Sequence, residues 1–469
     1  MPPHRLNLLR KFFSNLRLAV NGSEQDFTTG SIRKAIFMLS IPMILEMVME
    51  SLFAVVDIFF VSQVSINAIA TIGLTESVIT LIYALAIGLS MAATAMVSRR
   101  VGEKDYQKAS LTAAQAIILG MAISAITGIA GLLFPKEILG LMGAEPELIE
   151  EGYGYTRILI GCNITIMMIF LINAIFRGAG NASIAMRSLW LANGLNILLD
   201  PLFIFGLGPV PAFGVEGAAI ATTIGRGVAV LYQCYMLSNG KGRIKVSLAD
   251  LRFKAEMSLR LIRISLGGIG QFLIGTSSWL FLMRIMSEFG SEVLAGYTIA
   301  IRIIMFTILP SWGMSNAAAT LVGQNLGAKQ PERAEKSVWK TAQYNMYFMV
   351  FVSIIYIAFA NQFIRLFTDA TDVIYYGSLC LRIIAGGYLF YAYGMVVSQA
   401  FNGAGDTKTP TWINLISFWL FQLPVAYFTA IYLEWGPVGV FLAIAVSESL
   451  LAILAILIFR KGKWKTVEV

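Results

Sequence analysis

Three carboxylates, Glu46, Glu50 and Asp57, lie within one apolar stretch near the start of the chain. A charge inside a membrane span costs about 2.5–3.5 kcal/mol even on the lenient insertion scale, so each needs a function or a partner. Their spacing, at about 100° per residue, places the three side chains within about 40° of one another on one helix face. The spacing therefore predicts an acidic stripe that faces a cavity. The alternative is that the carboxylates pair with buried arginines or cap backbone groups.

A second polar cluster is encoded by Asn196 and Asp200, which lie four residues apart and are followed by Pro201. Proline has no N–H, so the carbonyl of Ile197 loses its helical partner at the level of these two side chains. Oxygen-bearing side chains beside a freed carbonyl suit a hard cation such as Na⁺, and the same carboxylate can instead hold a proton. The alternative is a proline kink with a solvated aspartate near the outer interface.

Four more polar residues are expected to complete this region. Thr222 and Arg226 are four residues apart in the next apolar stretch, Asn193 lies one turn before Asn196, and Asn173 lies in the preceding stretch. Asn173 and Asn193 are expected to extend the polar lining. Arg226 is expected either to neutralise one carboxylate and to release it when a proton or cation enters, or to act as a static counter-ion.

The elements that position these residues are membrane spans, because the chain of 469 residues is 57% hydrophobic and 13% charged, whereas soluble domains are about one quarter charged. The single histidine lies in the N-terminal tail, the three cysteines are scattered, and no P-loop is encoded, which argues against an intramembrane enzyme or an ATP-driven pump. The apolar runs predict an all-α membrane protein with helices near 35–62, 66–97, 111–134, 153–176, 185–207, 215–238, 258–287, 292–322, 337–360, 374–401, 410–433 and 437–460.

Most of the 35 Lys and Arg residues fall in every second loop and in the two tails, which predicts an even number of spans with both termini cytoplasmic in the inner (plasma) membrane. The net charge of +8 is thus interpreted as a topology signal, and no nucleic-acid partner is expected. The expected segments are a basic tail 1–32, an N-lobe 33–239, a cytoplasmic linker 240–257, a C-lobe 258–460 and a tail 461–469.

An internal repeat at an offset of 225 residues divides the spans into two halves, because Gly88-Leu-Ser-Met-Ala-Ala matches Gly313-Met-Ser-Asn-Ala-Ala. Six spans per half predict lobes related by a pseudo-two-fold axis along the membrane normal, an architecture typical of alternating access. The alternative is a duplicated bundle without transport function. Glu46 and Asp57 are replaced by Gln271 and Leu282 in the second half, so acid chemistry is expected in the first half alone. The second half is rich in aromatic residues that suit a flat or cationic ligand.

Several motifs in order resemble the multidrug and toxic compound extrusion (MATE) transporters, from about residue 30 to 460. They are Pro42 and Asp57 within 40–61, the Gly88 and Gly313 blocks, Arg177-Gly-Ala-Gly, Asn196 with Asp200-Pro201, and Gly217-Ala-Ala-Ile-Ala-Thr222. The resemblance implies a cation site at Asp57, Asn196, Asp200 and Thr222, a lobe-lining Asn173, and a helix hinge at Pro42. A functional glutamate that one branch places in the seventh helix is absent here, which points to the prokaryotic branch that couples through the N-lobe. Glu50 departs from the family, where an amide is more typical.

The sequence thus predicts a monomeric antiporter without a cofactor that exports small organic cations such as drugs and dyes in exchange for Na⁺ or H⁺. Neutralisation of the N-lobe carboxylates is expected to bend the first helix at Pro42 and to expel the substrate. The nearest alternative is a lipid-linked oligosaccharide flippase of the wider superfamily, whose cleft should be lined by arginines rather than acids. A channel or receptor is a further alternative, which the duplicated halves and one-sided acidic cluster disfavour.

Overall fold

The computed structural model describes residues 13–22, 25–61, 63–239 and 242–469, and within them leaves the side chains of Asp57, Ile58, Ile66 and Leu248 undescribed. The first half forms α2 (Ile32–Val61), α3 (Ile66–Gly102), α4 (Tyr106–Leu133), α5 (Pro135–Leu141), α6 (Pro146–Gly161), α7 (Ile164–Ala179), α8 (Ala182–Phe205) and α9 (Val215–Ser238). The second half forms η1 (Leu248–Asp250), α10 (Ala255–Ser287), α11 (Ser291–Gly327), α12 (Pro331–Arg365), α13 (Thr371–Gly386), α14 (Tyr388–Ala404), α15 (Lys408–Asn414), η2 (Leu415–Gln422), α16 (Leu423–Tyr427), η3 (Phe428–Tyr432), α17 (Pro437–Arg460) and η4 (Lys463–Thr466).

The predicted twelve-span, all-helical fold is confirmed. Within the described residues, nine helical segments are long and apolar enough to cross a membrane, and the pair α13–α14, bent by 58°, forms a tenth span. The remaining two are α2 with 30 residues and α9 with 24, each long enough to cross a hydrocarbon core of about 30 Å.

The helix ends differ from the prediction in two ways. The expected spans 153–176 and 374–401 are each divided, between α6 and α7 and between α13 and α14. In addition, α3 and α11 continue to Gly102 and Gly327, five residues beyond their expected ends at 97 and 322. An apolar run marks where a helix lies in lipid, but backbone hydrogen bonding can continue the helix into the aqueous phase.

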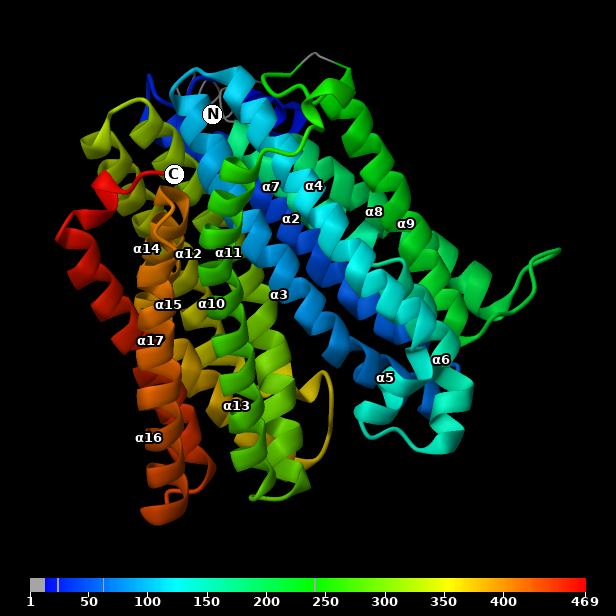
Figure 1. The fold of residues 1–469 in the computed structure, drawn as a ribbon. Coiled ribbons are helices and arrows are strands. Elements are labelled where there is room, and N and C mark those ends of the chain that lie inside the picture. The colour runs from blue at the N-terminus through cyan, green and yellow to red at the C-terminus, as the bar shows by residue number, and fades with distance from the viewer. Residues whose placement is uncertain (1–12, 23–24, 62, 240–241) are drawn as a thin grey trace, which may run out of the picture.

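The two halves form two bundles that pack together at the end where the C-terminus and the described start of the chain lie, and they diverge toward the other end (Figure 1). Helices α2 and α3 of the first lobe pack against α11 and α10 of the second. At this seam a Cβ on Gly313 would lie 3.0 Å from the backbone nitrogen of Ile44, and a Cβ on Gly88 would lie 2.8 Å from that of Ile269. Both the glycines and the isoleucines are 225 residues apart. The repeat therefore places a glycine in each lobe at the point where its helix crosses closest to the other lobe.

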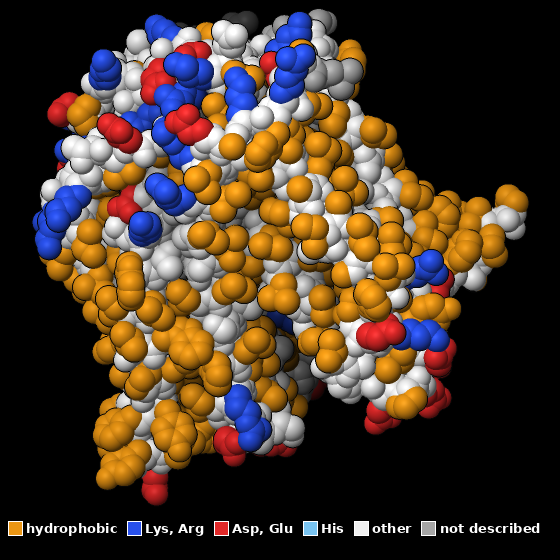
Figure 2. All heavy atoms as spheres, viewed as in Figure 1, with side chains coloured by type: hydrophobic (Ala, Val, Ile, Leu, Met, Phe, Trp, Pro, Cys, Tyr) orange, Lys and Arg blue, Asp and Glu red, His pale blue; other side chains and the backbone are white. Residues whose placement is uncertain are grey.

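The two terminal segments of the described chain are held by arginines where the lobes pack together. Arg187 of α8 donates to the carbonyl of Val20 at 3.1 Å, Arg333 of α12 donates to the carbonyl of Thr29 at 2.8 Å, and Arg99 of α3 donates to the carbonyl of Val467 at 2.7 Å. Lys and Arg side chains gather at this end, and hydrophobic side chains cover the middle of the molecule (Figure 2). Residues 1–12 and 23–24 of the expected tail 1–32 lie outside the described part of the chain.

Candidate functional site

A buried ion pair joins the first helix to the fourth span. Glu46 of α2 is 2% exposed, and its Oε1 lies 2.7 Å from Nη1 of Arg177 in α7. The same oxygen accepts a hydrogen bond from Asn173 at 3.1 Å, and Gln233 of α9 donates to Asn173 at 2.6 Å. The sequence left open whether Glu46 faces a cavity or pairs with a buried arginine. The structure shows that Glu46 pairs with Arg177. Arg177 and Gln233 were not singled out as site residues, because their contacts join segments far apart in the chain.

The predicted cation cluster comes together around Asn196. Asp200 is fully buried in α8, and Thr222 of α9 contacts Asn196. One orientation of the Asn196 amide donates to Asp200 Oδ2 at 2.8 Å and accepts from the Thr222 hydroxyl and backbone N–H at 2.9 and 3.0 Å, which satisfies every partner. The opposite orientation donates to the Thr222 hydroxyl at 2.9 Å and turns the amide oxygen toward the carboxylate. Three oxygen-bearing side chains therefore meet inside the first lobe.

The remaining predicted residues lie between and beside these two groups. Asn193 of α8 donates to Glu50 of α2 at 3.0 Å, so the second acid of the stripe has an amide partner. Arg226 is 8% exposed and donates to the Tyr83 hydroxyl at 3.2 Å. The side chain of Asp57 lies outside the described residues, and its backbone belongs to α2. Helix α2 runs through Pro42 as one element.

A cavity of about 300 Å³ opens between the lobes and is lined from the first lobe by Glu46, Glu50 and Asn173. The second lobe contributes Phe272 and Trp312 to the same wall. Asn196, Asp200 and Thr222 do not line this cavity, so the structure divides the predicted site into a part facing the space between the lobes and a part enclosed within the first lobe.

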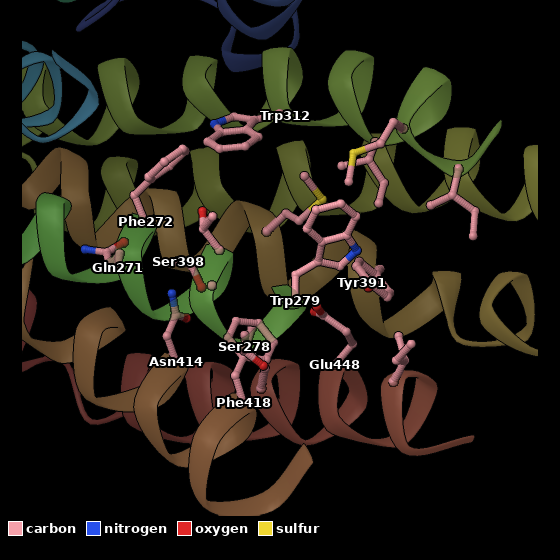
Figure 3. Close-up of a pocket in the computed structure, with 18 of the residues that line it drawn as sticks. Gln271, Phe272, Ser278, Trp279, Trp312, Tyr391, Ser398, Asn414, Phe418 and Glu448 are labelled. Carbon is pink, nitrogen blue, oxygen red and sulfur yellow. The ribbon is translucent and has the colours of Figure 1, made fainter. Parts of the chain in front are cut away.

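A larger cavity of about 460 Å³ lies in the second lobe and shares Phe272 and Trp312 with the first (Figure 3). Its lining includes Trp279 and Tyr391, two of the aromatic residues in which the second half is rich, and Glu448 of α17. The second half thus carries an intramembrane carboxylate that the expectation of acid chemistry in the first half alone did not consider. Glu448 was missed because only positions equivalent to the acids of the first half were compared. It is the one charged residue between Pro437 and Ile458, so the rule that each intramembrane charge needs a reason identifies it.

Comparison with known proteins gives matches over most of the chain. The MatE family model matches twice, over residues 42–202 and 269–428, once in each lobe. A probable multidrug resistance protein NorM of Thermotoga maritima is 27% identical over 442 residues, which cover 92% of this chain and 93% of that protein. The multidrug export protein MepA of Staphylococcus aureus is 22% identical over 92% of this chain and 94% of its own length.

Solved structures give the same result. An outward-facing multidrug resistance MATE family transporter of the MOP superfamily superposes with a TM-score of 0.88 at 28% identity, over 95% of this chain and 99% of that one. The two-fold match of the family model falls on the two lobes that the internal repeat predicts. The sequence and structural matches together show that this chain, a multi-pass membrane protein, belongs to the MatE family of transporters.

Proposed function

We propose that the protein is a multidrug efflux antiporter that exports organic cations from the cell in exchange for H⁺ or Na⁺ bound within the first lobe. The observation that carries this proposal is Asp200, a fully buried carboxylate in a membrane helix that is enclosed with Asn196 and Thr222. A buried charge in a membrane span is costly, so a carboxylate at this position indicates a functional role such as binding a proton or a cation. Relatives named for multidrug resistance and export support the cargo class.

The distribution of basic side chains supports an orientation with both termini in the cytoplasm. Lys and Arg gather at the end where the lobes pack together, and the lobes diverge at the opposite end (Figures 1 and 2). Because cytoplasmic segments of membrane proteins carry an excess of Lys and Arg, the divergent end faces outward. The structure then corresponds to the outward-open state of an alternating-access cycle.

The Asn196 amide provides a way to sense the occupant of the cluster. With Asp200 ionised, the amide nitrogen faces the carboxylate at 2.8 Å, and this is the favourable arrangement. The opposite orientation places two oxygens at that separation, which is a normal O–H···O length and so fits a proton carried by Asp200. Na⁺ would need the two oxygens farther apart, at its own coordination distances. The amide can therefore follow the charge of Asp200 by turning over when a cation neutralises the carboxylate.

The alternative of a lipid-linked oligosaccharide flippase requires basic side chains to hold a pyrophosphate. Among the described lining residues of the two cavities, Arg177 is the one basic side chain, and Glu46 neutralises it at 2.7 Å. Neither cavity thus offers a free positive charge to an anionic cargo. This charge balance favours the efflux of cations.

Reconstituted protein in vesicles tests the proposal through ethidium transport under an imposed pH gradient without Na⁺, or an imposed Na⁺ gradient at fixed pH. Wild type should respond to one of the two gradients, and Asp200→Asn should abolish the gradient-driven component because the amide cannot take up a proton. Glu137→Gln, which changes an exposed carboxylate in α5, is the matched control and should transport normally. Gradient-driven transport by Asp200→Asn at the wild-type rate would refute the assigned coupling site.

A further inference from the structure

The cavity of the second lobe combines a large apolar volume with a single negative charge. Its described lining contains the carboxylate of Glu448 and neither lysine nor arginine. Glu448 is partly exposed, and it points from α17 toward the part of the cavity where Trp279 and Tyr391 lie (Figure 3). The volume of about 460 Å³ falls within the roughly 300–1,000 Å³ of small-molecule sites.

No ion pair among the described residues neutralises Glu448. This separates it from Glu46, which also lines a cavity but is held by Arg177. A carboxylate in an apolar cavity is poorly solvated, so its ionised form gains most from a cation that enters the same cavity. Aromatic rings on the same wall add attraction for a cation through their faces.

The position of Glu448 in the repeat shows that this charge is specific to the second lobe. Helices α9 and α17 are both 24 residues long, and each follows a glycine with positive φ, Gly214 at 57° and Gly436 at 61°. Counted from these glycines, Glu448 occupies the position that Arg226 holds in the first lobe. One helix position thus carries a cation beside the buried cluster of the first lobe and an anion in the aromatic cavity of the second.

We propose that Glu448 is the anionic anchor of a cargo site for monovalent aromatic cations in the second lobe, with Trp279, Trp312 and Tyr391 as its aromatic walls. The inference rests on the proposed efflux function and specifies where its cargo is held. The two lobes then divide the work, because the coupling ion binds in the first lobe and the cargo in the second. Phe272 and Trp312, which line both cavities, connect the cargo site to the space between the lobes.

Equilibrium binding of tetraphenylphosphonium to purified protein in nanodiscs tests the site without any ion gradient. This probe keeps one positive charge at every pH, and triphenylphosphine oxide is a neutral probe of related shape. Glu448→Gln should raise the Kd of the cation by about tenfold or more and leave that of the neutral probe within about twofold. Glu448→Asp, which keeps the charge, should give an intermediate Kd for the cation. Glu292→Gln, an exposed carboxylate at the start of α11, is the matched control and should bind as wild type.

Wild-type cation affinity in Glu448→Gln would overturn the inference, as would an equal loss for the cationic and the neutral probe, which would indicate a damaged cavity. Near-ultraviolet circular dichroism of each variant establishes that the fold is intact before binding is compared. The outcome is separable from the proposed function, because Asp200→Asn should retain tetraphenylphosphonium binding while losing gradient-driven transport. A protein that transports normally after Glu448→Gln would keep the proposed function and lose this site.

Discussion

Replacement of Glu46 by leucine should strongly destabilise the first lobe, because it leaves the buried guanidinium of Arg177 without its counter-charge. The pair is short at 2.7 Å, and its side chains are 2% and 12% exposed. Removing one partner of a buried ion pair costs about 3–5 kcal/mol. We expect a value near the lower limit, about 3 kcal/mol, because the partly exposed Arg177 can recruit water from the cavity that it lines.

Two companion variants separate the charge from the packing. Glu46→Gln keeps an acceptor for Arg177 and Asn173 and should lose only about 1 kcal/mol, the difference between a charged and a neutral hydrogen bond. Glu46→Leu combined with Arg177→Met removes both charges, and it should be more stable than Glu46→Leu alone. The coupling between the two sites is expected at about 1–3 kcal/mol.

Thermal unfolding in detergent, followed with a thiol-reactive dye, measures these differences. Cys162, partly buried at the end of α6, reports unfolding of the first lobe, and the buried Cys380 of α13 reports that of the second. The exposed Cys234 is replaced by alanine in all variants. A loss of about 3 kcal/mol corresponds to a Tm decrease of roughly 6–12 °C for a lobe of this size. The reasoning fails if Glu46→Leu melts within about 1 °C of the parent protein, or if the double variant loses the sum of the two single losses.

Three other changes test the seam, the linker and a helix cap. Gly313→Val should lower stability by about 1–3 kcal/mol, because its side chain meets the α2 backbone; Gly73→Val, with no atom within 4 Å of an added Cβ, should lose less in the same thermal assay. Gln115→Ala should speed tryptic cleavage at Arg252, since the amide donates to the Arg252 carbonyl at 2.8 Å and accepts from the backbone N–H of Lys254 at 2.7 Å. Asp105→Ala should cost about 0.5–2 kcal/mol at pH 7. The backbone N–H of Lys108 holds the pKa of Asp105 below its ordinary 3.8, so this difference should vanish as the pH falls through the lowered pKa.

The number and order of the spans were predictable, because apolar length is a local property of the sequence. The division of the fourth span between Gly161 and Ile164 was not, because the apolar runs on the two sides of this short break together have the length of one membrane span. The ends of α3 and α11 were also missed, since backbone hydrogen bonds continue where the apolar run stops. Local patterns therefore locate a span in lipid but do not define its last turns.

The site was predictable where its contacts follow helix periodicity. Asn196 and Asp200 lie four residues apart in the sequence and meet in the structure. The partner of Glu46 was not predictable, because Arg177 lies 131 residues away and the spacing of charges within one helix carries no information about it. Glu448 is visible in the sequence as the one charged residue of its apolar stretch, so its place inside the membrane was predictable.

The repeat preserves the seam between the lobes but not the chemistry within them, and packing explains the difference. At the seam α3 crosses α10, and the equivalent helix α11 crosses α2. Gly88 and Gly313 therefore lie at equivalent close contacts, where an added Cβ would meet the backbone of the other lobe. Helices α9 and α17 do not form this crossing, so the position of Arg226 in one lobe is free to become Glu448 in the other. A symmetric frame with unlike charges suits the antiport proposed above, because both lobes would move together while the coupling ion and the cargo, which carry the same sign, would occupy separate sites. Each site then acts on the other through the shared equilibrium of the lobes rather than through direct repulsion in one pocket.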